Sequence, residues 1–108
     1  YRVMAKKISV LIKEPGKAPR HVNISSTLYN LQKTVGGYIE TVTLCSDLVI
    51  ICNEEGRLKG LPHCCKICGV DFVGTIVICG VKGDRFDHLP LGWQAMKDMF
   101  PVLWEVKQ

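Results

Sequence analysis

The sequence predicts a small α+β domain built on a mainly antiparallel sheet, with the element order β-β-α-β-β-loop-β-α. Three observations lead to this fold class. First, residues 1–108 suffice for a single domain with one core. Second, hydrophobic residues make up 47% of the chain, which is enough to build that core. Third, short apolar segments alternate with turns that contain glycine or proline, and no internal repeat or linker interrupts them.

The first half of the chain is predicted to form a hairpin followed by a helix. Residues 7–12 are β-prone and end at the turn 14–17, Glu-Pro-Gly-Lys, after which residues 21–24 alternate and should pair back. Apolar residues recur at helical spacing over 28–35, and the two serines at 25 and 26 offer a cap for this helix. The glycine pair that follows can end it, because glycine readily takes the left-handed conformation.

The second half is predicted to contain three strands and a C-terminal helix. Residues 38–44 alternate, as in a half-exposed strand. Residues 47–52 are almost wholly apolar, which predicts a central strand buried on both faces. An irregular loop at 57–72 should separate it from another apolar strand at 73–79. The last element is an amphipathic helix at about 90–100, ended by a proline.

Four side chains that can bind a metal fall within six positions. They are His63, Cys64, Cys65 and Cys68. Thiolates and imidazole are the ligands that zinc prefers, and Cys65 and Cys68 have the spacing of a chelating knuckle. The sequence therefore predicts a structural zinc ion held by these four residues.

The inserted segment 57–72 gives a physical reason for a metal. A structureless loop of this length is unusual in so small a domain, and zinc would lower the entropy cost of ordering it. Adjacent cysteines seldom ligate one ion together, so the fourth ligand stays open. Cys52 and Asp71 are the alternatives for that position.

Composition narrows the classes of function. The net charge of +4, from 14 basic and 10 acidic residues, disfavours a DNA mimic, which needs an array of carboxylates. No apolar run approaches the ~20 residues that cross a bilayer, and no leader is recognisable, so we expect a cytoplasmic protein without a membrane partner. In a reducing compartment the six cysteines should be thiols or metal ligands rather than disulfides.

The sequence offers little that indicates catalysis, and we expect no enzyme. Imidazole can activate a thiol, so a nucleophile beside His63 is one alternative. Nothing in the sequence supplies a third orienting group or an oxyanion hole, and zinc would occupy the thiolates. Cys52 and Cys79 end apolar strands, where cysteine acts as a small buried hydrophobe. Trp104, beyond the predicted helix, is the one aromatic residue of the C-terminal segment that could lie outside the core.

Several motifs along the chain resemble one uncharacterised domain family, common in phages and mobile elements of gut Firmicutes. The motifs are Glu14-Pro15-Gly16-Lys17 with Pro19, Leu31-Gln32, Val35-Gly36-Gly37-Tyr38-Ile39-Glu40, Ile51-Cys52-Asn53-Glu54-Glu55-Gly56, Leu58, Gly60-Leu61-Pro62, Val73-Gly74-Thr75 and Ile78-Cys79-Gly80. The resemblance covers nearly the whole chain and implies no activity. The cysteine cluster departs from it, so the predicted zinc site would be an elaboration on a shared scaffold.

A small phage-type domain with an added metal loop also resembles zinc-containing anti-CRISPR proteins. That resemblance implies a stoichiometric inhibitor that binds a type II CRISPR effector nuclease and hinders target DNA loading or cleavage. The partner rests on the resemblance alone.

Two other functions stay open at this point. A zinc-knuckle protein that binds nucleic acid directly would use basic residues near the cluster, such as Arg57, Lys59 and Lys66. A thiol enzyme or redox protein would need a cysteine with a low pKa.

Overall fold

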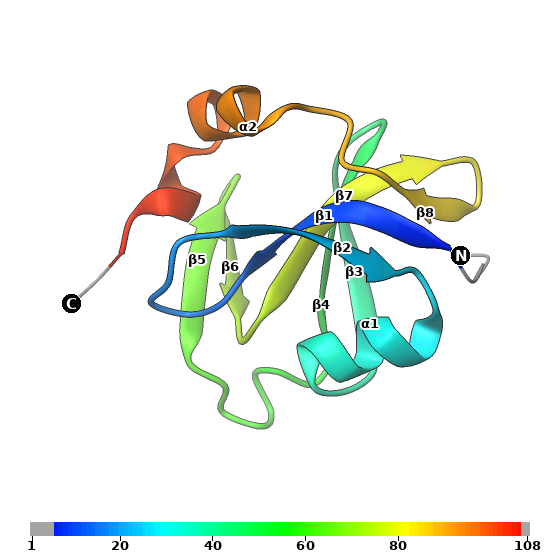
Figure 1. Ribbon diagram of the computed structural model, residues 1–108. Helices are drawn as coiled ribbons and strands as arrows, with labels where there is room; N and C mark the ends of the chain where they lie inside the picture. Colours follow the sequence, from blue (N-terminus) through cyan, green and yellow to red (C-terminus); the bar gives the residue numbers. More distant parts are fainter. Residues whose placement is uncertain (1–5, 107–108) are drawn as a thin grey trace.

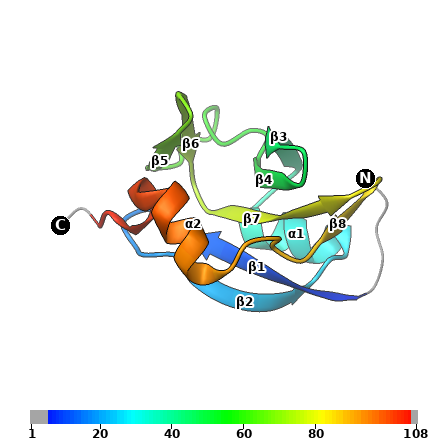
Figure 2. The same ribbon diagram turned by 90° about the horizontal axis from the view of Figure 1, so that it is seen from above.

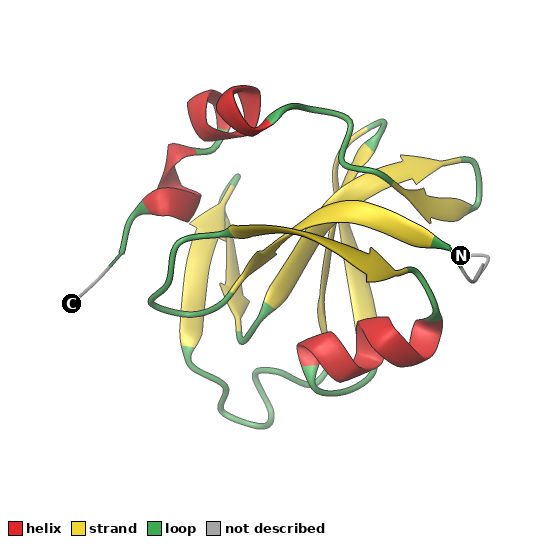
Figure 3. Cartoon of the chain, viewed as in Figure 1, coloured by secondary structure: helices red, strands yellow, loops and turns green. Residues whose placement is uncertain are grey.

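The structure, a computed structural model, describes residues 6–106. Within these residues it contains eight strands, two α-helices and one 3-10 helix (Figures 1 and 3). The strands are β1 (Lys7–Lys13), β2 (Arg20–Ser25), β3 (Ile39–Cys45), β4 (Leu48–Asn53), β5 (His63–Ile67), β6 (Val70–Val73), β7 (Ile76–Lys82) and β8 (Arg85–Asp87). The helices are α1 (Leu28–Val35), α2 (Trp93–Met99) and the 3-10 helix η1 (Pro101–Trp104).

Six of the strands form one sheet in the order β2-β1-β7-β4-β3, with β8 paired to β7. Every pairing in it is antiparallel. β5 and β6 pair only with each other and form a separate hairpin beside this sheet (Figure 2). The α+β class with a mainly antiparallel sheet is therefore confirmed.

The sheet is buried on both faces. On β4, Leu48, Ile50 and Cys52 face one core, while Val49 and Ile51 face the other. This follows from the two-residue period of a strand, and it explains why the segment reads as continuously apolar. The first core is completed by the β5–β6 hairpin, α2 and η1, and the second core is completed by α1. Figure 1 shows α1 and α2 on opposite sides of the sheet.

Both predicted helices are present, with differences at their ends. Thr27, rather than either serine before it, caps α1, because its hydroxyl accepts a hydrogen bond from the amide of Asn30 at 3.3 Å. Gly36 ends α1 in the left-handed conformation, as the sequence predicts. Met96 of α2 is fully buried. Trp104, which the sequence left free to lie outside the core, packs edge-on against Trp93 with ring centroids 5.3 Å apart and contacts the first core.

The segment 57–72 is not the irregular loop that the sequence predicted. Turns occupy 54–60, and the cysteine-rich part forms β5 and β6. Cys65, Ile67 and Phe72 of this hairpin are buried in the first core, so apolar burial contributes to ordering the segment. β8 was also missed, because three residues are too few to show a strand period.

The connection after β8 crosses β7 at Gly80. The carbonyl oxygen of His88 lies where a Cβ atom at this position would be, so only glycine allows the two backbones to pass. The crossing is held by a hydrogen bond from the amide of Leu89 to the carbonyl oxygen of Ser9, at 2.7 Å. In the part of the chain that is described, no helix is long and apolar enough to span a bilayer.

Candidate functional site

The hairpin brings three of the four predicted zinc ligands to one pocket and leaves the fourth apart. His63, Cys64 and Cys65 line a cavity of about 300 Å³, together with residues from η1 and its tail. Cys68 is exposed in the turn at the far end of the hairpin, where its φ of 50° is left-handed. At about 3.3 Å per strand residue, the length of β5 separates His63 from Ile67, the residue before Cys68, by roughly 13 Å.

These positions do not fit one tetrahedral ion. Zinc holds its ligands at about 2.0–2.3 Å, which the ends of one strand cannot satisfy together. Among residues 6–106 no three His, Cys, Asp or Glu side chains are arranged to hold a metal. Of the two alternative ligands, Asp71 pairs with His63, and Cys52 lies in a different pocket. Zinc on these four residues stays a prediction, and it would require the hairpin to rearrange.

His63 and Asp71 form an exposed pair across the hairpin. The ring Nε2 atom lies 3.0 Å from the carboxylate of Asp71. The hydrogen bond from His63 lowers the pKa of Asp71, and the positive charges of Lys66 and Arg57 act in the same direction. About half of each side chain is exposed to water, so this pair contributes little to stability.

A β-bulge in β5 brings the two adjacent cysteines into contact. His63 pairs with Val73 and Cys65 pairs with Phe72, so Cys64 is an extra residue on its strand. The interaction between the two thiols lowers the pKa of Cys65 and raises that of Cys64. Cys64 is partly exposed, while Cys65 is nearly covered.

A buried lysine lies behind this pair. Lys13 is only 1% exposed, and its ammonium donates hydrogen bonds to the carbonyl oxygens of Glu14 and Lys17. Its own carbonyl oxygen lies 3.6 Å from the sulfur of Cys64. The positive charge favours the thiolate form of both cysteines. Lys13 lies on the same face of β1 as the buried Leu11.

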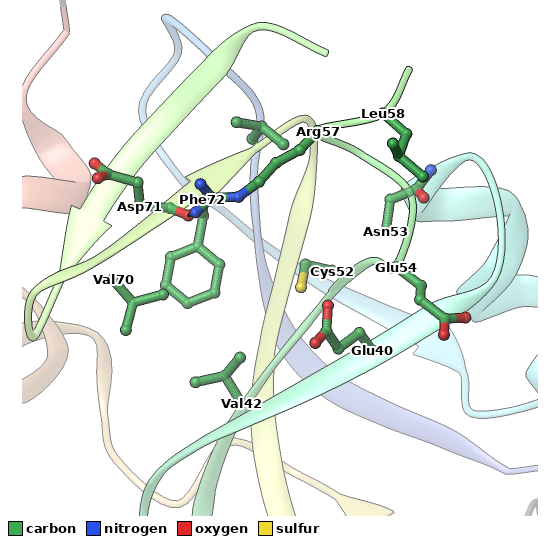
Figure 4. Close-up of a pocket in the computed structure, with 11 residues that line it drawn as sticks. Glu40, Val42, Cys52, Asn53, Glu54, Arg57, Leu58, Val70, Asp71 and Phe72 are labelled. Atoms are coloured by element: carbon green, nitrogen blue, oxygen red, sulfur yellow. Dashed lines mark hydrogen bonds between the residues drawn. The ribbon is translucent and has the colours of Figure 1, made fainter. Parts of the chain in front are cut away.

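A second pocket, of about 220 Å³, lies between the main sheet and the hairpin (Figure 4). β3 and β4 form one wall with Glu40, Val42 and Cys52, and β6 forms the other with Val70 and Phe72. Glu40 and Cys52 are direct cross-strand partners, which places the carboxylate beside the thiol. Burial and the charge of Glu40 raise the pKa of Cys52 to about 11, so its thiol is protonated near neutral pH.

Two turn residues complete the rim of this pocket. Arg57 donates a hydrogen bond from its guanidinium to the carbonyl oxygen of Asp71 at 2.8 Å, which ties the turn to the hairpin. Leu58 is 87% exposed. Glu40 and Leu58 were not predicted as site residues, because neither belongs to a chemical motif.

Comparison with known families matches residues 7–100 to DUF3846, a domain of unknown function. The match includes every residue of the second core and of the Glu40 pocket, whereas Leu103 of the first core and Val102 and Glu105 of the thiol pocket lie beyond it. The chain belongs to the DUF3846 family. No curated protein and no solved structure matches it. Membership of an uncharacterised family is what the motif resemblance predicted, and the DUF3846 description assigns no activity.

The thiol pair and the pocket of Glu40 are thus two separate features of this DUF3846 domain. Cys79 is a third case, because it is fully buried in β7 and lines neither pocket. Its burial and the Asp87 carboxylate raise its pKa to about 12. The packing role predicted for Cys79 is confirmed, whereas Cys52 both packs and lines a pocket.

Proposed function

We propose that this protein is a non-enzymatic inhibitor that binds a type II CRISPR effector nuclease stoichiometrically and hinders target DNA loading or cleavage. The observation that supports a protein-binding role is the pocket between β3 and β6, where apolar walls surround a free carboxylate. The kind of nuclease comes from the sequence resemblance.

The apolar part of this pocket suits a protein partner. Val42 and Phe72 line it, Val70 is 40% exposed at its edge, and Leu58 projects beside it (Figure 4). Apolar anchors at the centre of an interface supply most of the binding energy in protein complexes. The exposed Leu58 can therefore insert into a partner, and the adjacent pocket can accept a side chain of that partner.

The charge of the pocket indicates the kind of side chain that it accepts. Glu40 forms no ion pair within residues 6–106, while the nearby Arg57 is engaged by a backbone carbonyl. A lysine or arginine of the partner would place its stem between Val42 and Phe72 and its cation on Glu40. Nucleases that hold nucleic acid carry such side chains along a positively charged channel. Capture of one of them would obstruct the path of the target strand.

Two other proposals remain separate from this one. Direct binding of nucleic acid would use basic residues near the hairpin, such as Lys59 and Lys66, and an acidic pocket between them opposes it. Structural zinc on His63, Cys64, Cys65 and Cys68 is tested by metal analysis of the purified protein, and docking through Glu40 does not depend on it.

The test is a pull-down and target-cleavage assay with a reconstituted type II nuclease, with and without guide RNA. We expect Glu40→Lys and Leu58→Ala each to weaken association about 30-fold, the equivalent of about 2 kcal/mol for a central anchor. Asp84→Lys makes the same charge change on the β7–β8 turn and should bind as the parent does. Tyr29→Ala, which removes another large exposed hydrophobic side chain, on α1, is the matched control for Leu58.

If the parent protein associates with the nuclease neither with nor without guide RNA, the proposed partner is wrong. Association that Glu40→Lys leaves intact would show that another surface docks. Tight binding of free DNA or RNA, weakened by added salt, would favour the nucleic-acid alternative.

A further inference from the structure

The pair Cys64 and Cys65 has a geometry that a regular strand does not provide. Successive side chains of a strand point to opposite faces, so neighbouring thiols normally lie apart. The bulge between His63 and Cys65 removes this alternation, and both residues line the same cavity. Two sulfurs from consecutive residues are therefore available at one point.

The two thiols line one cavity, in which Cys64 is partly exposed and Cys65 is nearly covered, and they lie beside a fixed positive charge. Both line the cavity of about 300 Å³ whose other walls include Gly16, Val102 and Glu105. The buried Lys13 approaches from the core side, and no acidic side chain pairs with its ammonium within residues 6–106. A positive charge beside a thiol pair opposes a bare metal dication and favours a neutral ligand that bonds to sulfur.

We propose that Cys64 and Cys65 form a vicinal dithiol site that takes a trivalent, thiophilic metalloid compound through two sulfur bonds. In the reaction with an organoarsenic(III) oxide, two As–S bonds form and the bonds from arsenic to oxygen break. The oxygen leaves with both thiol protons as water, and arsenic stays trivalent. The site needs two sulfurs and a pocket for the organic group, all of which this side of the hairpin provides.

This assignment differs from the four-ligand zinc site that the sequence predicted. It requires neither Cys68, which is at the far turn, nor His63, which is engaged by Asp71. A thiophilic centre that takes few ligands can be held by thiolates alone. Zinc in a structural site instead needs a closed set of four ligands. The two assignments therefore predict different effects of removing Cys68.

The test uses phenylarsine oxide as the probe. The intact protein, with zinc removed, should form a 1:1 adduct in the mass spectrum, and a small dithiol should reverse it while a monothiol should not. Alkylation of the adduct followed by peptide mapping should find Cys64 and Cys65 protected together and Cys68 labelled. This mapping is done on the parent protein, so it does not depend on a variant that folds.

Variants give the second measurement. Cys64→Ala and Cys65→Ala should each weaken retention of the probe by at least about 100-fold, since a two-point attachment becomes a single one. Cys68→Ser and Cys45→Ser remove exposed thiols elsewhere and should retain the parent's adduct. An adduct that survives the loss of Cys64 or Cys65, or one that disappears with Cys68, would overturn the proposal. Zinc that blocks the probe in the parent protein but not in Cys68→Ser would overturn it as well, in favour of the four-ligand site.

Discussion

Raising the pH above 9 should destabilise this domain through a buried thiol in its central sheet. Cys79 lies in β7, the strand paired with both β1 and β4, and it is fully buried. Burial, reinforced by the carboxylate of Asp87, raises its pKa from 9.0 to about 12. The unfolded chain has no such environment, so its thiol loses a proton near the ordinary value.

The sign of the effect follows from which state keeps the proton. Below pH 9 both states are protonated, and the contribution of Cys79 to stability is fully present. Between pH 9 and pH 12 the unfolded chain deprotonates while the folded protein does not, so the free energy of unfolding falls. At about 1.36 kcal/mol per pKa unit, the full loss is about 4 kcal/mol. This is a large part of the 5–15 kcal/mol that typically stabilises a domain.

Urea denaturation at a series of pH values from neutrality past pH 9 measures this loss. Lysine and tyrosine also titrate in this range, so the comparison is with Cys79→Ala, in which their contribution is unchanged. The parent protein should lose stability more steeply than this variant, by up to about 1.36 kcal/mol per pH unit. Cys45→Ala removes an exposed thiol and should follow the parent. Parallel curves for the parent and Cys79→Ala would refute the reasoning.

Three further substitutions test the fold itself, each by chemical denaturation. Gly80→Ala should destabilise by at least about 1–3 kcal/mol, because its Cβ would meet the His88 carbonyl, whereas Gly92→Ala meets open space and should change little. Phe72→Ala should cost about 3–5 kcal/mol if the hairpin is part of the core, and equal stability would show that the hairpin folds independently. Asn53→Ala should cost about 1–3 kcal/mol, because Asn53 links the last turn of α1 to β4 through the carbonyl oxygen of Val35 at 3.2 Å.

The elements that the sequence predicted well are those with a strong single signal. β4 and β7 are buried on both faces, so their apolar runs do not depend on register. β5 gave no such signal, because its bulge breaks the two-residue alternation and its residues are metal-capable types. The spacing of possible metal ligands therefore led to the prediction of a loop in this segment, whereas the structure has a hairpin with buried apolar residues.

The candidate sites were harder to predict for a different reason. The cysteine cluster could be found from spacing, but the contact between Cys64 and Cys65 depends on a bulge that only pairing with β6 defines. Lys13 is a charged residue at the end of a strand, and such residues are seldom buried, so its place behind the thiols could not be expected. The pocket of Glu40 lies between the main sheet and the hairpin, and no local sequence pattern predicts how these two pack against each other.

The two pockets lie on the same hairpin, and this has a consequence for their independence. Cys65, in the thiol pair, is the cross-strand partner of Phe72, which lines the pocket of Glu40. A ligand that pulls the two sulfurs together acts on the bulge, and the bulge sets the register between β5 and β6. If that register changes, Phe72 moves and the affinity for a protein partner changes with it. Linkage then requires the partner to alter the affinity of the thiol pair by the same factor. Equal nuclease binding by the free protein and its phenylarsine oxide adduct would show instead that the hairpin isolates the two sites.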